Sequence, residues 1–218
     1  RNPDIDTLGK NKSRLILLNK SDLADEKVNK LWKEWFEEQG YFVVEVNARS
    51  GMGIRPINAI VKEACKEKIE RDRKRGILNR PVRAMVVGIP NVGKSTFINS
   101  YAKKACTKTG NKPGVTKGKQ WIKLSKEIEL LDTPGILWPK FEDQQVGLNL
   151  ALTGSINDEI LNIEELAGEF IRFMQNRYPG VIEERYGIEN CSDVIDAIEN
   201  IAKVRGCLLK GGAYDTKK

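Results

Sequence analysis

The sequence contains no histidine and no CxxC pair, and its four cysteines are widely scattered among 218 residues. Zinc sites need clustered cysteine or histidine ligands, so this class of site is excluded. Isolated cysteines instead predict reduced thiols in a cytosolic protein. The chain also lacks any run of 18 apolar residues, so neither a transmembrane helix nor a membrane partner is expected. A signal peptide is missing as well, and the start without methionine suggests a piece that has lost its natural beginning.

Charge is unevenly distributed along the chain. The formal net charge is +7, but residues 141–200 hold 13 acidic and 3 basic residues, a local charge of −10, so the remainder carries +17. Basic residues are dense in 62–83 and again in 103–126. A solvated helix face is the ordinary explanation of a basic run. The asymmetry nevertheless favours a polyanionic partner, for which RNA is the natural candidate.

Hydrophobic patterning predicts an α/β fold with a largely parallel sheet. Short apolar runs are typical of buried strands, and here they alternate with segments of helical periodicity. Such alternation favours a layered α/β architecture. The predicted strands are 14–18, 41–46, 84–87, 121–124 and 128–131. The predicted helices are 27–39, 54–70 and 95–103. A charged connector is expected over 71–80, and a polar loop over 105–119.

The pattern changes near residue 140, after which only helix-period segments occur. These segments are 143–152, 157–176 and 192–205, and Ser192 is suited to be the N-cap of the last, with Asp193 in its first turn. We therefore expect an α/β domain over residues 1–142. A small all-α domain over residues 143–218 follows it, and its end looks truncated.

The strongest motif is Gly-Ile-Pro-Asn-Val-Gly-Lys-Ser at 88–95, which matches the phosphate-binding pattern GxxxxGK[ST] in full. The motif follows a predicted strand and precedes a predicted helix, as its geometry requires. Backbone N–H groups of such a loop bind phosphate oxygens, aided by the positive helix terminus. We expect Lys94 to act catalytically on the β- and γ-phosphates and Ser95 to bind Mg²⁺ through its hydroxyl. The expected nucleotide-binding residues are Pro90, Asn91, Val92, Gly93, Lys94, Ser95 and Thr96.

A second motif, Asp132-Thr133-Pro134-Gly135, follows the apolar run 128–131. A carboxylate at a strand end beside the phosphate loop is placed for a second contact to Mg²⁺, which we expect of Asp132. The N–H of Gly135 can bond to the γ-phosphate, so we expect Gly135 to bind nucleotide and to act in catalysis. A plain β-turn is the alternative. The spacing of 37 residues between Lys94 and Asp132 favours the nucleotide site.

The base is indicated by Asn19-Lys20-Ser21-Asp22, which follows the first predicted strand. The Asp22 carboxylate can accept hydrogen bonds from N1–H and the 2-amino group of guanine. Adenine offers neither donor, so it would leave a carboxylate unpaired. We expect Asn19 to bond the base edge and the Lys20 stem to pack over the ring. A helix cap at a strand–helix turn is the alternative for this short motif.

The order of the motifs supports guanine recognition in a circularly permuted domain. In an ordinary GTPase the NKxD motif follows DxxG, whereas residues 136–218 contain no copy and Asp22 lies 72 positions before Lys94. A further base-contacting element should come one helix and one strand after NKxD. Asn47-Ala48-Arg49 stands at that place, and the backbone of Ala48 can contact guanine O6. The connector 71–80 then joins the old chain ends.

The succession NKSD, NAR, GIPNVGKST, PGVT and DTPG resembles the circularly permuted GTPases of the YlqF/YawG group. The resemblance covers nearly the whole chain and includes TGSINDEI at 153–160 and the helical C-terminal part. It implies a cytoplasmic, ribosome-associated GTPase that binds GTP and GDP. The implied partners are the precursor of the large (50S) ribosomal subunit and its rRNA, and we expect a monomer.

Further residue roles are implied by the same resemblance. Thr116 in PGVT is implied to be the switch threonine, a catalytic residue that closes on Mg²⁺ when the γ-phosphate is present. Asn91 matches the asparagine of potassium-stimulated GTPases and implies K⁺ beside the phosphates, with a local turn bond as the alternative. Ile136 stands where other GTPases carry a water-positioning glutamine, and it cannot orient water. We therefore expect slow hydrolysis alone and acceleration by the ribosomal subunit.

Three functions remain open from the sequence. The first is a GTP-hydrolysing switch in large-subunit assembly, favoured by the set Lys94, Ser95, Thr116 and Asp132. The second is an RNA-binding module with a structural GTP, favoured by Ile136. The third is a sensor of guanine nucleotides with little turnover.

Overall fold

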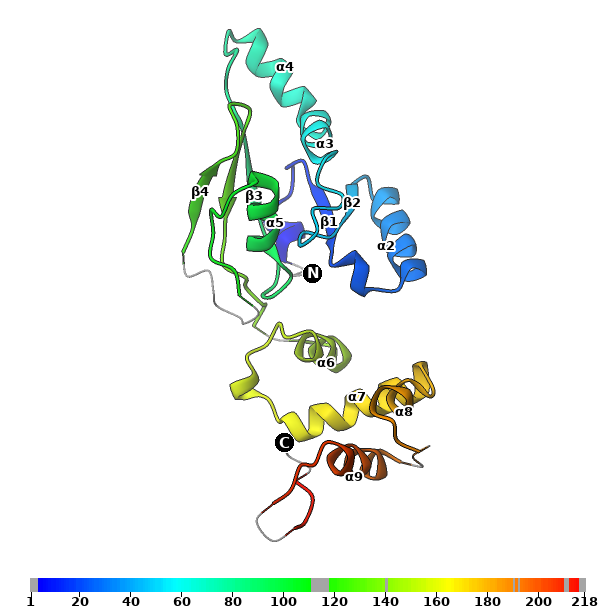
Figure 1. Ribbon diagram of the computed structural model, residues 1–218. Helices are drawn as coiled ribbons and strands as arrows, with labels where there is room; N and C mark the ends of the chain where they lie inside the picture. Colours follow the sequence, from blue (N-terminus) through cyan, green and yellow to red (C-terminus); the bar gives the residue numbers. More distant parts are fainter. Residues whose placement is uncertain are drawn as a thin grey trace. The chain divides into compact units, whose positions relative to one another are not determined.

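The computed structural model describes residues 4–110, 118–139, 141–189, 191, 193–209 and 212–215. The chain divides into two compact units, Arg1–Phe141 and Glu142–Lys218. All described strands belong to the first unit, and the described part of the second unit is built from helices and turns (Figure 1). Among the described helices, none is both long and apolar enough to span a lipid bilayer.

The first unit begins with a parallel strand pair. β1 (Leu15–Asn19) and β2 (Phe42–Val46) run side by side from Leu15 opposite Phe42 to Asn19 opposite Val46. Between them lie a short 3-10 turn, η1 (Ser21–Leu23), and helix α2 (Glu26–Glu38). The Asp25 carboxylate caps α2 by accepting from the first free amides of the helix. An unpredicted short helix, α1 (Asp4–Leu8), precedes β1.

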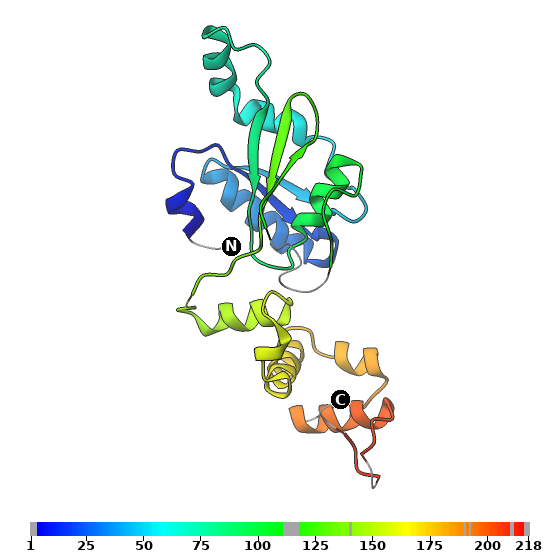
Figure 2. The same ribbon diagram turned by 90° about the vertical axis from the view of Figure 1, so that its left-hand side faces the viewer.

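The second sheet has the order β3–β5–β4 and carries the phosphate loop. β3 (Val82–Val86) pairs in parallel with β5 (Ile128–Asp132), and β4 (Gln120–Lys123) pairs antiparallel with β5, which confirms the predicted hairpin. Helix α5 (Lys94–Ala102) covers one face of this sheet (Figure 2). The parallel pairs match the α/β prediction, but hydrogen bonds divide the described strands between two sheets.

One hydrophobic core joins the two sheets. Ile98 of α5 is fully buried, and it packs among side chains from both strand pairs and from helix α3 (Ile57–Ala64). The two sheets therefore form one folded body, although no ladder of hydrogen bonds between the described strands joins one sheet to the other. The buried members of this core are Val44, Val46, Ala48, Ile57, Phe97, Ile98, Ile122, Ile128 and Leu130.

The predicted single helix over 54–70 is wrong in detail. The structure has two helices, α3 and α4 (Lys66–Lys74), separated at Cys65, whose backbone leaves the helical region. Helix α4 also extends into the predicted connector 71–80, because lysine and arginine are good helix formers where nothing terminates the helix. No described residue of α4 is buried, so α4 presents its charges to solvent.

The second unit contains α6 (Gln144–Leu152), η2 (Asp158–Ile160), α7 (Ile163–Arg177), α8 (Val181–Tyr186) and α9 (Val194–Val204). The predicted helix over 157–176 was wrong at its start, since the Asn162 side chain caps a helix that begins at Ile163. Helix α8 was not predicted. The N-cap of α9 is Asp193 and not Ser192, because the Asp193 carboxylate accepts from two amides of the first turn. The small core contains Ile171, Ile182, Cys191 and Ala197.

Candidate nucleotide-binding site

The phosphate loop connects the end of β3 to the start of α5. Its backbone turns sharply, with left-handed φ angles of 56° at Asn91 and 87° at Gly93. A Cβ atom at Gly93 would lie only 2.5 Å from Nδ2 of Asn19, so this position has neither the conformation nor the room for a side chain. Lys94 then starts α5, so the amides of the first turn point back towards the loop as a phosphate site requires.

Lys94 is held inside this loop by backbone carbonyls. Its Nζ donates hydrogen bonds to Gly88 O at 2.9 Å and to Ile89 O at 2.7 Å. Burial lowers the pKa of the Lys94 ammonium, and the negative charge of Asp132 opposes this shift. Phosphate oxygens can replace these carbonyls as acceptors, so the ammonium is already close to the place where it is expected to act.

Asp132 ends β5 as a buried carboxylate. Its side chain has 0% exposure, and within the described part of the chain neither oxygen accepts a hydrogen bond of standard geometry. Burial raises the pKa of Asp132, while the nearby Thr133 amide and the Lys94 ammonium lower it. Uncompensated buried carboxylates are costly and are usually paired or bound to a metal. This orphaned group therefore fits a divalent cation such as Mg²⁺, with the Ser95 hydroxyl as a second oxygen ligand.

The residues after Asp132 lie against the phosphate loop. Thr133 Oγ1 donates to Val86 O at 2.7 Å, which joins the ends of β5 and β3. A Cβ at Gly135 would lie 2.6 Å from Pro90 Cα and 2.8 Å from Lys94 Nζ. Gly135 therefore touches the loop through its backbone, as expected for a group that senses the γ-phosphate. Ile136, next along the chain, is 63% exposed.

The guanine motif meets the phosphate loop directly. Asn19 Nδ2 donates to Val92 O at 2.8 Å, and Lys20 Nζ donates to Asn91 O at 2.9 Å. Lys20 adopts a left-handed backbone with φ 59°, which is unfavourable for lysine and aims the side chain at the loop. Segments more than 70 positions apart in the sequence are thereby joined in one site.

Asp22 lies exposed in η1, and among the described residues no hydrogen bond or ion pair engages its carboxylate. The second base element contacts the first directly. The Ala48 N–H, expected at guanine O6, donates to Asn19 Oδ1 at 3.1 Å. Asn47 Oδ1 accepts from the amides of Arg49 and Ser50 and stabilises the turn. These residues therefore orient Asn19 and the turn in this structure.

A clamp at the end of α5 was not predicted from the sequence. Asn99 Oδ1 accepts from the amides of Cys106 and Thr107, both at 2.8 Å, and Asn99 Nδ2 donates to Thr107 O at 2.9 Å. Thr107 Oγ1 in turn donates to Ser95 O at 3.1 Å. The start of the polar loop is thus fixed to the residue expected to bind Mg²⁺. Thr116, further along that loop, lies outside the described residues.

Comparisons with known proteins show the family to which this chain belongs. A family model described as "50S ribosome-binding GTPase" matches residues 83–202. The ribosome biogenesis GTPase A of Bacillus cereus is 50% identical over 100% of this chain and 74% of its own length.

Two solved structures from Thermotoga maritima have a similar fold. GNP-bound YlqF has a TM-score of 0.57 and 32% identity, covering 93% of this chain and 71% of its own. GDP-bound YlqF has a TM-score of 0.58 and 30% identity, covering 93% and 72% respectively.

The fold and the site define a P-loop GTPase whose guanine motif precedes its phosphate loop. The chain belongs to the 50S ribosome-binding GTPases, among the circularly permuted YlqF-type members that include ribosome biogenesis GTPase A. The predicted class, its fold and its GTPase activity are therefore confirmed at the level of the family.

Proposed function

We propose that this chain is a cytoplasmic, monomeric assembly factor that uses GTP to bind and leave precursors of the large ribosomal subunit. The main observation is the pair of hydrogen bonds from Asn19 and Lys20 to the phosphate loop, because they unite base recognition and phosphate binding in one site. The printed name of the matching family supports a ribosomal partner. We propose a GTPase domain over residues 1–142 and a helical domain over 143–218.

In this proposal the nucleotide is bound at both ends by groups that are already in place. Asp22 accepts from the guanine edge, with Asn19 and the Lys20 stem beside the base. The amides of Asn91, Val92 and Gly93, together with those of Ser95 and Thr96, surround the phosphates. Lys94 exchanges the carbonyls of Gly88 and Ile89 for phosphate oxygens, and its positive charge stabilises the charge that develops during transfer.

The donor set at the end of β5 supports Mg²⁺. We propose that Ser95, Asp132 and Thr116 contribute oxygens to it, directly or through water. When bound, Mg²⁺ neutralises charge on the β- and γ-phosphates. Asp132 itself gains a cationic partner, which removes the energetic cost of its buried charge.

The switch is proposed to depend on Gly135. Its backbone contacts Pro90 and Lys94, so a γ-phosphate that enters the loop also meets the Gly135 amide. Loss of that phosphate removes a hydrogen-bond acceptor and frees the segment that begins at Gly135. The ribosomal precursor is expected to bind the ordered form more tightly than the released form.

Slow hydrolysis without the ribosome is part of the proposal. Ile136 is exposed and apolar, so it offers no group to orient the attacking water. We propose that the ribosomal precursor supplies or orders the missing element. K⁺ held beside Asn91 would add positive charge near the phosphates, and turnover is then expected to be faster in potassium than in sodium buffer.

Co-sedimentation with purified 50S precursors tests this function. The chain is mixed with precursors in potassium buffer with a non-hydrolysable GTP analogue or with GDP, and the pelleted protein is measured. Association with the analogue but not with GDP is expected. Asp22→Asn serves as the matched variant, because it should lose the nucleotide effect while all phosphate-loop residues stay intact. Equal association in both nucleotide states would overturn the switch.

A further inference from the structure

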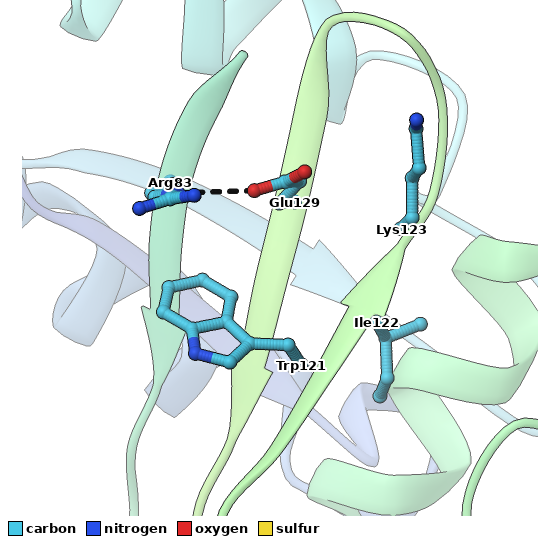
Figure 3. A pocket seen from close by; sticks show the side chains of 5 residues that line it. All are labelled: Arg83, Trp121, Ile122, Lys123 and Glu129. Atoms are coloured by element: carbon cyan, nitrogen blue, oxygen red, sulfur yellow. Dashed lines mark hydrogen bonds and ion pairs between the residues drawn. The ribbon is translucent and has the colours of Figure 1, made fainter.

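A pocket of about 280 Å³ lies on the β3–β5–β4 sheet, and no residue of the phosphate loop lines it (Figure 3). Trp121 and Glu129 alternate along their strands with core residues Ile122, Ile128 and Leu130. Because successive side chains of a strand point to opposite faces, the pocket opens on the face opposite α5. The lining residues are Arg83, Trp121, Ile122, Lys123 and Glu129.

The indole of Trp121 is the main apolar surface of this pocket. Trp121 is 54% exposed and lies on β4, the outer strand of this sheet, which leaves a large aromatic surface open to solvent. The Arg83 guanidinium lies 5.3 Å from the ring centroid, and Arg83 Nε donates to Glu129 Oε2 at 3.0 Å. The ion pair to Glu129 thus holds the Arg83 guanidinium over one side of the Trp121 ring, while more than half of the residue stays accessible.

The charge around the pocket is positive. Residues 1–141 carry a net charge of +13, whereas residues 142–218 carry −6. Lys123 lines the pocket, and Lys119 and Lys126 lie just before and after the same strand.

Helix α4 carries a second group of basic residues in the same unit. An ion pair of 2.9 Å between Lys62 Nζ and Glu127 Oε1 ties α3 to the turn between β4 and β5. Helix α4 follows α3 directly, and both views place it beyond this turn (Figures 1 and 2). Its last turn carries Arg71, Arg73 and Lys74. Helix α4 thus adds a second group of basic side chains beyond the β4–β5 turn.

We infer that this sheet face binds single-stranded RNA, with one unpaired base stacked on Trp121. An exposed aromatic ring with flanking cations is the chemistry that binds single-stranded nucleic acid, because each base offers a π face and each linkage a phosphate. A duplex does not present its base faces, so it lacks the stacking contact. The inference rests on the proposed function, in which unfolded rRNA of the precursor supplies such strands.

Fluorescence anisotropy with a labelled RNA strand of about eight nucleotides and mixed sequence tests the inference. Trp121→Ala is expected to weaken binding roughly 5- to 150-fold, the range for loss of one aromatic stack. Trp121→Phe should retain most of the affinity because it keeps a ring. Trp32→Ala is the matched control, since Trp32 is 52% exposed on α2 and far from this pocket in the sequence. It should bind like the unaltered chain.

Further outcomes separate this inference from the proposed function. Equal RNA affinity of Trp121→Ala and Trp32→Ala would overturn the inference, and so would tighter binding of the same strand when paired with its complement. Nucleotide affinity is measured in parallel and should be the same in all variants. If Trp121→Ala still co-sediments with precursors as well as the unaltered chain, this face is not the RNA contact, while the GTP-dependent switch stands. Absence of GTP-dependent co-sedimentation in the unaltered chain would instead overturn the proposed function.

Discussion

Replacing Gly93 with alanine perturbs the point where the guanine motif touches the phosphate loop. Gly93 has φ +87°, and an alanine Cβ would lie 2.5 Å from Asn19 Nδ2. The Asn19 side chain would have to move away. It would then lose its bond to Val92 O and the bond that it accepts from the Ala48 amide. The substitution therefore strains one backbone position and breaks two long-range hydrogen bonds.

The magnitude follows from these parts. A left-handed backbone costs a non-glycine residue about 1–2 kcal/mol, and each lost hydrogen bond costs about 1 kcal/mol. Gly93→Ala should therefore lower the free energy of unfolding by about 3 kcal/mol. When Asn19 is already alanine, the collision and both bonds are absent, so the same substitution should cost only the backbone strain. A double-mutant cycle should give a coupling of about 2 kcal/mol.

Urea unfolding of the nucleotide-free chain is the assay, followed by tryptophan fluorescence. All four tryptophans lie in the first unit, so their emission reports the unfolding of that unit. Gly40→Ala is the matched control, because Gly40 has φ +78° with nothing within 4 Å of its added Cβ. Gly40→Ala should lower the free energy of unfolding by the backbone strain alone, and by the same amount whether or not Asn19 is replaced. If Gly93→Ala lowered the free energy of unfolding equally with Asn19 and with alanine at position 19, the reasoning would be refuted.

Three further predictions concern the site. Asp132→Asn should raise the free energy of unfolding of the nucleotide-free chain near neutral pH and weaken Mg²⁺-dependent GTP binding. Burial raises the pKa of Asp132 in the folded chain, so the ionised carboxylate destabilises the fold only above the ordinary carboxyl pKa. The gain in unfolding free energy from Asp132→Asn should therefore vanish below that pKa and grow as pH rises. Urea titrations at several pH values check this dependence. Asp22→Asn should weaken GDP binding by about tenfold or more. It should improve the binding of xanthosine diphosphate, since the introduced side-chain amide can donate to the C2 carbonyl of xanthine. Unchanged GDP affinity in calorimetry would contradict the role given to Asp22. Thr107→Val should lower kcat about fivefold because it removes the hydrogen bond that ties the polar loop to Ser95, whereas Thr107→Ser keeps the hydroxyl and should retain the rate.

The sequence alone predicted those features that depend on short motifs and local periodicity. The phosphate loop was placed correctly between a strand and a helix because its glycines, lysine and serine are constrained within eight positions. The permuted order of the motifs also predicted that the guanine-reading half and the phosphate-binding half share one domain. The structure joins these halves through hydrogen bonds from Asn19 to Val92 and from Lys20 to Asn91, which the motif itself does not specify.

Features set by tertiary contacts could not be predicted in this way. The Asn99 clamp depends on the path of the chain after α5, which periodicity does not encode. The Ala48 amide bonds to Asn19 because β1 and β2 are in register, and no local pattern gives that register. The break at Cys65 is equally invisible, because residues 54–70 have helical periodicity throughout.

The bonds that join the guanine motif to the phosphate loop also have a consequence for how the protein folds. They connect residues 73 and 71 positions apart, so the site is made of contacts with high sequence separation. Contacts of this kind form late, after the entropy of closing a long loop has been overcome. During synthesis the guanine-reading half emerges first and must wait for the phosphate loop. Completion of the nucleotide site is therefore a late step in folding, and a bound nucleotide would hold both halves of the domain in their final arrangement.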